Sequence, residues 1–223
     1  MKSNKLLNFT NLKAVLIDLD GTIADSIPIL YNVYATFLKE YGRQGSKEEF
    51  QSLMGPSLIE IVKKIKLLHE LDDKLDAMIK KYFQMLLWHY SHDVKLFDGV
   101  REFLNYANEK KLKLALVTSA GKHLSEAFLN SCNLSTLFDL VMTGDKVTKG
   151  KPSPEIYQKA LQELNVAPEE AIAVEDSPKG IESALNAGLA VLCFNPISKI
   201  SFGNRVLPVH SWQEILNLFQ NKI

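Results

Sequence analysis

The chain has 223 residues, of which 46% are hydrophobic and 23% are charged, an ordinary composition for a globular protein. Its 26 basic and 26 acidic residues give a formal net charge of zero, which excludes a basic field that would gather nucleic acid or hold a membrane surface. No apolar run approaches the roughly 20 residues that a membrane helix needs, and the N-terminal residues do not form a signal peptide. We therefore expect a cytoplasmic protein whose partner is a small molecule.

Short apolar runs alternate with amphipathic stretches along most of the chain. Such runs are typical of strands that are buried on both faces of a parallel sheet. Strands that alternate with helices of this size predict right-handed β-α-β units, and therefore an α/β fold with a parallel sheet and helices on both of its faces. The predicted strands are residues 14–19, 112–117, 140–143, 171–174 and 190–194, and the predicted helices are residues 100–110, 122–130, 155–165 and 179–187, with a final helix after Ser211.

One segment interrupts this alternation, because residues 26–92 follow a helical pattern throughout. A first helix is expected to stop at Gly42, and two short helices begin at capping boxes that open with Ser46 and Ser57. A longer helix is predicted over residues 72–88, with an apolar side suited to a helical bundle. The predicted domains are a core of residues 1–24 and 94–223 and an inserted helical domain of residues 25–93.

Polar side chains follow several of the predicted strands. In open α/β sheets, ligands bind at the carboxyl ends of the strands, so these side chains are expected to meet at one rim. The residues concerned are Asp18 and Asp20 after the first strand, Thr118 and Ser119 after the next, Glu175 and Asp176 after a third, and Lys151 in the loop before residue 155.

Four carboxylates at one rim require a cation. Two carboxylates about 4 Å apart repel by roughly 4 kcal/mol at an effective dielectric constant near 20, and a phosphate dianion adds to this repulsion. A hard divalent ion offsets the charge, and ligation by oxygen alone with few protein ligands is typical of Mg²⁺. Lys151 would supply the remaining positive charge, and Thr118 could donate a hydrogen bond to a phosphoryl oxygen.

The spacing of Asp18 and Asp20 indicates two different roles. Residues two apart in an extended segment point the same way, so one carboxylate can attack phosphorus while the other handles the proton of the leaving group. Hydrolysis of a phosphomonoester needs such help, because it is among the slowest uncatalysed reactions.

Four short motifs, in the expected order, resemble the signatures of the haloacid dehalogenase-like phosphatases. The resemblance covers essentially the whole chain, including the helical insert of the small-cap subgroup to which phosphoglycolate phosphatases and beta-phosphoglucomutases belong. It implies a Rossmann-like parallel sheet with an inserted all-α cap that closes over the site. The motifs are Asp18-Leu19-Asp20-Gly21-Thr22, Leu116-Val117-Thr118-Ser119, Gly150-Lys151-Pro152 and Val174-Glu175-Asp176-Ser177.

The resemblance also implies a role for each acidic residue of the rim. Asp18 would be the nucleophile that forms an aspartyl-phosphate, and Asp20 would be the general acid/base. Mg²⁺ would be held by Asp18, by the backbone carbonyl of Asp20 and by Asp176, with Glu175 as a further ligand.

The phosphoryl group would be bound by Thr118, Ser119 and Lys151, of which Lys151 also serves catalysis. The implied reaction is the magnesium-dependent hydrolysis of a small phosphorylated metabolite, similar to phosphoglycolate or a sugar phosphate. The apolar face of the cap suggests a substrate with little charge beyond its phosphate. The protein is expected to be a monomer or a homodimer.

Three other activities share parts of this pattern. A phosphosugar mutase of the beta-phosphoglucomutase type has the same fold, nucleophile and cap, but it carries basic residues where this chain has Ile29-Leu30-Tyr31 and Met54-Gly55-Pro56-Ser57-Leu58. A dehalogenase lacks the second acid, so Asp20 argues against it. A non-catalytic sensor of phosphorylated ligands is not favoured, because every expected catalytic residue is present.

Overall fold

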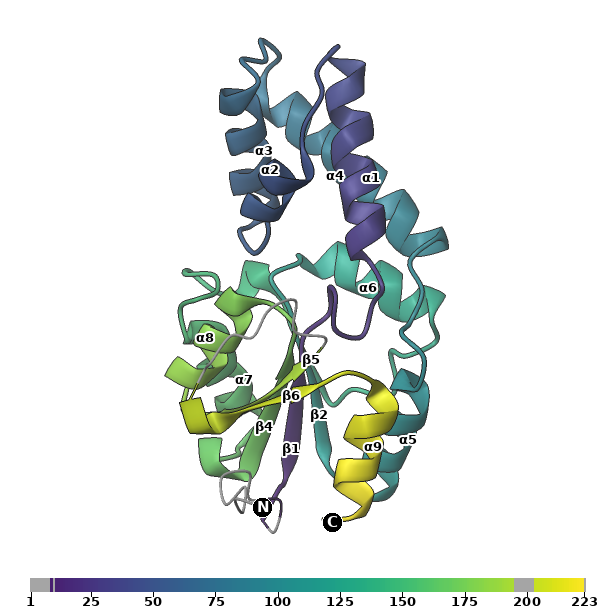
Figure 1. The fold of residues 1–223 in the computed structure, drawn as a ribbon, viewed down its shortest axis with the longest axis vertical. Coiled ribbons are helices and arrows are strands. Elements are labelled where there is room, and N and C mark those ends of the chain that lie inside the picture. The colour runs from purple at the N-terminus through teal and green to yellow at the C-terminus, as the bar shows by residue number, and fades with distance from the viewer. Residues whose placement is uncertain (1–8, 10, 195–202, 223) are drawn as a thin grey trace.

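The computed structural model describes residues 9, 11–194 and 203–222 (Figure 1). The N-terminal residues 1–8, on which the prediction of no signal peptide rests, lie outside this part of the chain. Within it, six strands form a single sheet, and a group of helices extends beyond one end of that sheet. None of the described helices has the length and apolar character needed to cross a membrane.

All strand pairs of the sheet are parallel, in the order β3-β2-β1-β4-β5-β6. The chain runs from β1 outward through β2 to β3 and then crosses to β4, on the other side of β1. The strand order therefore reverses beside β1, and the crevice at such a reversal is where open α/β sheets bind ligands. The strands are β1 Ala14–Ile17, β2 Lys113–Val117, β3 Leu140–Met142, β4 Ala171–Glu175, β5 Ala190–Phe194 and β6 Val206–Val209.

Helices cover both faces of the sheet. Because successive side chains of a strand point to opposite faces, Val15 and Ile17 of β1 pack with α5, α6 and α9, whereas Ala14 and Leu16 pack with α7 and α8. The helices of this part are α5 Val100–Glu109, α6 Lys122–Ser131, α7 Glu155–Leu164, α8 Pro178–Asn186 and α9 Trp212–Gln220, with short 3₁₀ helices at Gly144–Lys146, Pro168–Glu170 and Gly203–Arg205.

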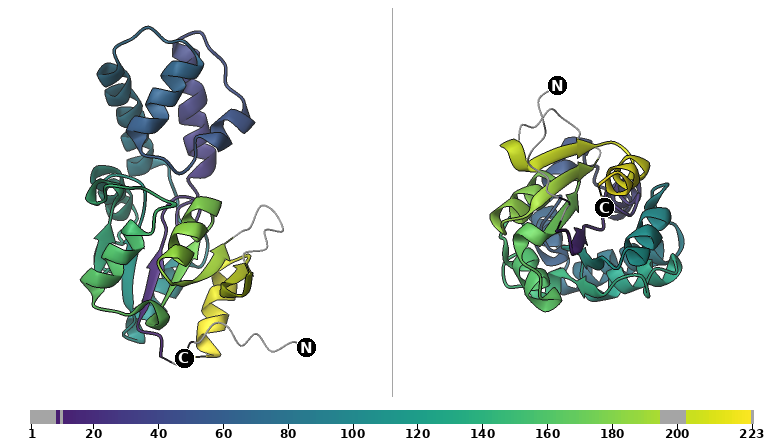
Figure 2. Two further views of the ribbon diagram at one scale, coloured as in Figure 1. Left: turned by 90° about the vertical axis from the view of Figure 1, so that its left-hand side faces the viewer. Right: turned by 90° about the horizontal axis from the view of Figure 1, so that it is seen from below.

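Four further helices, here called the inserted helices, lie between β1 and α5 in the chain and beyond the sheet in space (Figure 2). Two of them begin where the capping boxes predict, because the hydroxyl groups of Ser46 and Ser57 accept hydrogen bonds from the backbone N–H groups of Glu49 and Glu60 at 3.1 and 3.4 Å. The inserted helices are α1 Ile27–Glu40, α2 Lys47–Ser52, α3 Leu58–Leu68 and α4 Leu75–His92.

The main differences from the sequence prediction concern helix α4, which also ends four residues later than predicted, at His92, and strand β6; strand β1 is two residues shorter than predicted. Helix α4 begins three residues later than predicted, because Asp73 is held in the preceding loop by hydrogen bonds from the Tyr41 hydroxyl and the Lys66 ammonium group, at 2.9 Å each. Strand β6 is absent from the prediction because Pro208 interrupts its apolar pattern. Proline is tolerated there because β6 is an edge strand of the described sheet.

Trp212, the first residue of α9, connects this helix to the loop that follows Asp20. Its indole is fully buried, and its Nε1–H group donates a hydrogen bond to the carbonyl oxygen of Thr22 at 2.9 Å. The ring packs against Phe103 of α5 and Phe194 of β5, with ring centroids 5.2 and 5.8 Å away. Through Trp212, helix α9 therefore stabilises the loop that follows Asp20.

We expect Trp212→Ala to lower the free energy of unfolding by about 3–5 kcal/mol, because the substitution leaves a large cavity and an unpaired carbonyl group. Urea denaturation measures this change. Trp88 is the only other tryptophan of the chain and is 55% exposed, so Trp88→Ala is a matched control expected to cost about 1 kcal/mol or less. Equal losses in the two variants would contradict the role assigned to Trp212.

Candidate active site

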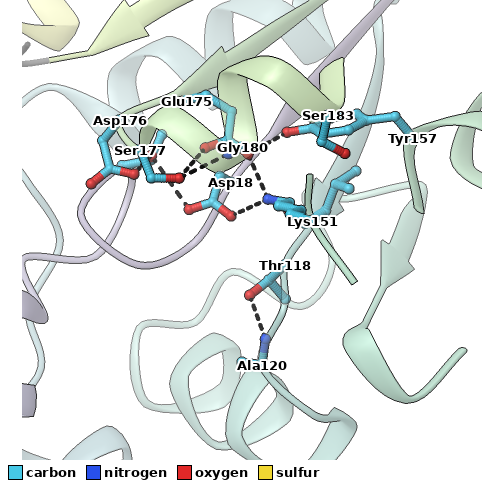
Figure 3. A network of polar contacts seen from close by, with 12 residues as sticks. Asp18, Thr118, Ala120, Lys151, Tyr157, Glu175, Asp176, Ser177, Gly180 and Ser183 are labelled. Carbon is cyan, nitrogen blue, oxygen red and sulfur yellow. Dashed lines mark hydrogen bonds and ion pairs between the residues drawn. The ribbon is translucent and has the colours of Figure 1, made fainter. Parts of the chain in front are cut away.

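The carboxyl ends of three neighbouring strands bring the predicted site residues together. Asp18 directly follows β1, and its backbone N–H donates to the carbonyl oxygen of Val174 at 3.0 Å, which continues the pairing with β4. Thr118 directly follows β2, and Glu175 is the last residue of β4. The side chains of Asp18, Thr118 and Glu175 are all buried and lie around one point (Figure 3).

Lys151 occupies the centre of this group. Its Nζ donates hydrogen bonds to Asp18 Oδ1 at 2.6 Å, to Glu175 Oε1 at 2.5 Å and to the carbonyl oxygen of Val117 at 3.0 Å (Figure 3). Burial acts to lower the pKa of Lys151, but the carboxylates of Asp18 and Glu175 outweigh this effect and hold the pKa above its ordinary value. The lysine is therefore charged, and all three of its N–H groups are paired.

Glu175 lies behind Lys151 and is completely buried. In addition to Lys151, the hydroxyl groups of Tyr157 and Ser177 donate to its carboxylate, at 2.6 and 3.4 Å. Burial, together with the charge of Asp18, raises the pKa of Glu175, whereas Lys151 acts to lower it. With donors on both oxygens, the carboxylate is fixed in orientation and in turn fixes the lysine.

A compact acidic cluster adjoins this lysine. Carboxylate oxygens of Asp18, Glu175 and Asp176 all lie within 4.8 Å of one another. Burial and the charge of Asp18 raise the pKa of Asp176, so the negative charges of the cluster destabilise one another. Gly21 is required beside it, because a Cβ atom at this position would overlap the Asp176 carboxylate. This set of hard oxygen donors fits Mg²⁺, as the sequence predicts.

Asp20 lies beside the cluster and has a different environment. The hydroxyl groups of Ser26, at 2.7 Å, and of Tyr90 both donate to its Oδ1. Burial raises the pKa of Asp20 to about 6, although these two hydrogen bonds act to lower it. A carboxyl group with a pKa near neutrality can both donate and accept a proton at physiological pH.

Thr118 and Ser119 form the opposite wall. The backbone N–H of Ala120 donates to Thr118 Oγ1 at 3.0 Å, which leaves the hydroxyl proton of Thr118 free to be donated to a ligand (Figure 3). Ser119 lines the same cleft. Six of the seven predicted site residues line this cleft, and the seventh, Glu175, lies behind them, in contact with Lys151 and within the acidic cluster.

The cleft lies between the sheet and the inserted helices and has a volume of about 140 Å³. On the side of the sheet it is lined by the polar residues described above. On the other side its lining is mostly apolar. The apolar side chains there are Leu30, Met54, Pro56, Leu58, Ile61 and Leu86.

Four further residues of the site have no signal in the sequence. Tyr157, Tyr90 and Ser26 hold the acidic residues, and they belong to none of the four motifs. Lys179 of α8 also lines the cleft, and its Nζ donates to the carbonyl oxygen of Met54 at 3.0 Å, which connects the core to the inserted helices. These contacts join distant parts of the chain, so only the fold reveals them.

A family model supports the interpretation of this geometry. The model of the haloacid dehalogenase-like hydrolases matches residues 15–194. The chain belongs to this family. The residues of this haloacid dehalogenase-like hydrolase that match the family model include all four motifs, so the predicted family is confirmed.

Relatives of the same family match over most of the chain. A phosphorylated carbohydrates phosphatase from Thermotoga maritima is 30% identical over 221 residues, which cover 94% of this chain and 99% of that protein. A phosphoglycolate phosphatase from Nitrosospira multiformis is 32% identical over 189 residues, which cover 82% of this chain and 82% of that protein. The crystal structure of CbbY from Rhodobacter sphaeroides in complex with phosphate has a TM-score of 0.81 at 26% identity, covering 92% of this chain and 96% of that one. The predicted phosphatase-type hydrolase and Rossmann-like fold are therefore confirmed at the level of the family.

We expect Gly180→Ala to destabilise this haloacid dehalogenase-like hydrolase by about 1–3 kcal/mol, the usual effect of overpacking. Glycine to alanine in a helix is ordinarily stabilising, but a Cβ atom at Gly180 of α8 would overlap the fixed carboxylate of Glu175. Urea denaturation measures the effect. A Cβ atom at Gly150 would meet no atom within 4 Å, so Gly150→Ala is the control. It should leave the free energy of unfolding within about 0.5 kcal/mol of the wild type. A stabilised Gly180→Ala variant would show that Glu175 is free to move.

Proposed function

We propose that the chain is a magnesium-dependent phosphatase that hydrolyses a small phosphomonoester through an aspartyl-phosphate on Asp18. The observation that carries this proposal is the ion pair of Lys151 and Asp18, at 2.6 Å, buried at the carboxyl end of β1. The pair orients the Asp18 carboxylate, as a nucleophile requires, and places a positive charge where a phosphate would bind. Asp20, two residues further on, supplies an acid on the same side.

In the first half-reaction, an Asp18 carboxylate oxygen forms a bond to phosphorus while the bond from phosphorus to the leaving oxygen breaks. The leaving oxygen keeps the electron pair of that bond and takes the proton from the Asp20 carboxyl group. In the second half-reaction, the Asp20 carboxylate takes a proton from water as the water oxygen attacks phosphorus. The bond from phosphorus to Asp18 then breaks, which restores the carboxylate and releases phosphate.

The remaining residues bind and orient the phosphoryl group. Thr118 donates its free hydroxyl proton to a phosphoryl oxygen, Ser119 adds a further donor, and Lys151 offsets the negative charge that reaches the site. Asp18, the backbone carbonyl of Asp20, Asp176 and Glu175 are the residues that would hold Mg²⁺. The bound ion supplies positive charge that permits an anionic nucleophile and an anionic substrate to approach each other.

We further propose that residues 25–93 act as a cap domain over a core of residues 1–24 and 94–223. The apolar lining that the inserted helices give to the cleft favours a substrate with little charge beyond its phosphate. The names of the relatives point to phosphoglycolate and carbohydrate phosphates as the classes to test first.

A phosphosugar mutase is the alternative on the same scaffold. A mutase must hold the second phosphate of a bisphosphate intermediate, which requires cationic side chains on the cap side of the cleft. Among the described residues, the cleft is lined by only two cationic side chains, Lys151 and Lys179, and both come from the core. Lys179 is moreover engaged with Met54. The cleft therefore favours hydrolysis over mutase activity.

We expect the purified protein to release phosphate from at least one member of a panel of phosphomonoesters, and we expect EDTA to abolish this release and added Mg²⁺ to restore it. The panel contains phosphoglycolate, hexose phosphates, nucleotides, pyrophosphate and phenyl phosphate, and liberated phosphate is measured. Conversion of hexose 1-phosphate into hexose 6-phosphate without phosphate release would instead identify a mutase. No turnover of any kind would favour a non-catalytic sensor.

We expect Asp18→Asn to lower turnover by more than about 10³-fold while the protein stays folded, because the amide is a poor nucleophile in an unchanged volume. Steady-state kinetics and circular dichroism measure the two properties. Asp25 is an exposed carboxylate in the segment that follows β1, so Asp25→Asn is a matched control expected to retain wild-type turnover. Substantial activity in Asp18→Asn would rule out Asp18 as the nucleophile.

A further inference from the structure

Tyr90 brings a hydroxyl group from the inserted helices to the general acid/base proposed above. It lies in the last turns of α4 and is only 2% exposed. Its hydroxyl donates to Oδ1 of Asp20, a residue 70 positions earlier in the chain. Tyr90 also lines the cleft, so this contact is made at the edge of the site itself.

The position of Tyr90 is fixed on the core. The hydroxyl group of Ser131 in α6 lies 3.2 Å from the backbone carbonyl oxygen of Tyr90 and 2.9 Å from that of Phe128, so the two carbonyl groups share its one proton. The Tyr90 ring belongs to the large apolar core that α4 shares with α5, α6 and α9. The tyrosine is thus held from its backbone and from its ring, and its hydroxyl has a defined direction.

The two donors on Asp20 occupy one oxygen and leave the other free. Ser26, at 2.7 Å, and Tyr90 both donate to Oδ1, while within the described residues no donor reaches Oδ2. Two contacts on one oxygen fix the orientation of the carboxyl group. Oδ2 is the oxygen of Asp20 that remains available to a leaving group.

We propose that Tyr90 is a positioning residue that, together with Ser26, holds Oδ1 of Asp20 and so fixes the orientation in which Asp20 presents Oδ2 to the leaving group. The inference rests on the proposed function, because Tyr90 acts only through the acid/base role of Asp20. Without the Tyr90 hydroxyl, only Ser26 holds Oδ1, so the carboxyl group can rotate and Oδ2 loses its fixed position. Proton delivery to the leaving oxygen then becomes less effective, while nucleophilic attack by Asp18 is unchanged.

This role has a kinetic signature that a purely structural role lacks. A leaving group of high pKa needs the proton of Asp20, whereas nitrophenolate leaves readily without one. The test therefore measures kcat/KM for phenyl, 4-chlorophenyl and 4-nitrophenyl phosphate, which have similar shapes and leaving groups of decreasing pKa. The ratio of kcat/KM between two of these substrates on one protein sample does not depend on the fraction of that sample that is folded.

We expect the wild type to depend weakly on the leaving group and Asp20→Asn to depend on it strongly, since general acid catalysis contributes about 10²–10⁴-fold. Tyr90→Phe, which removes one oxygen atom and keeps the ring, should fall between them. Its kcat/KM should decrease about tenfold or more for phenyl phosphate, as is typical of a misplaced catalytic group, and no more than about twofold for 4-nitrophenyl phosphate.

Tyr82→Phe is the matched control. Tyr82 lies on the same helix two turns before Tyr90, is 4% exposed, and packs against Phe37 with ring centroids 5.0 Å apart. Its hydroxyl makes no hydrogen bond to the described part of the chain. Tyr82→Phe should therefore keep the wild-type dependence on the leaving group.

The outcomes separate this inference from the proposed function. If Asp20→Asn steepens the dependence on the leaving group but Tyr90→Phe does not, or if Tyr90→Phe slows all three substrates equally, the inference on Tyr90 is overturned and the phosphatase stands. If the wild type hydrolyses none of the substrates, or if Asp20→Asn leaves the dependence unchanged, the proposed role of Asp20 fails and the inference falls with it. A steeper dependence in both variants supports the positioning role.

Discussion

The ammonium group of Lys151 lies between two buried carboxylates, and much of the local structure follows from keeping it there. A buried ion pair is seldom a net gain in stability, because removing charges from water costs several kcal/mol per ion, so each member needs further partners. Glu175 obtains them from Tyr157 and Ser177, and Lys151 obtains a third acceptor in the carbonyl of Val117. The close fit of Gly180 against Glu175 belongs to the same arrangement. Burying these charges costs folding free energy, and in return the proposed nucleophile has a fixed orientation.

The sheet topology explains why these groups can meet at all. The central position of β1, between β2 and β4, places Asp18 next to the carboxyl ends of both neighbours. Asp18 and Thr118 follow the last residues of β1 and β2, and Glu175 is the last residue of β4, so the polar groups gather at the strand ends while the strand interiors stay apolar. The insertion of α1–α4 directly after β1 has a related effect, because the helices begin close to the acidic cluster and need no long connection to cover it.

The sequence predicts the parts of this arrangement that are encoded locally. Asp18 and Thr118 are recognisable because each follows an apolar strand, and the serine caps are recognisable because their partners lie three residues away. The contacts of Tyr90 and Tyr157 could not be predicted, because their partners lie 70 and 18 residues away and neither tyrosine differs in pattern from an ordinary core aromatic. Strand β6 was missed for a different reason: Pro208 is compatible with an edge strand, but whether a strand lies at an edge is a property of the whole sheet.

The two walls of the cleft have different origins, and this bears on how such a protein can diversify. One wall consists of polar residues at strand ends, where almost any substitution disturbs a charge or a hydrogen bond. The other consists of aliphatic side chains such as Leu30, Leu58 and Leu86 on the inserted helices, where one apolar residue can replace another at little cost to folding. Mutations can therefore accumulate on the second wall and alter the accepted molecule while the first wall is conserved by selection. Relatives that differ in their named substrates, yet align with this chain over most of its length, are what such separate evolution would produce.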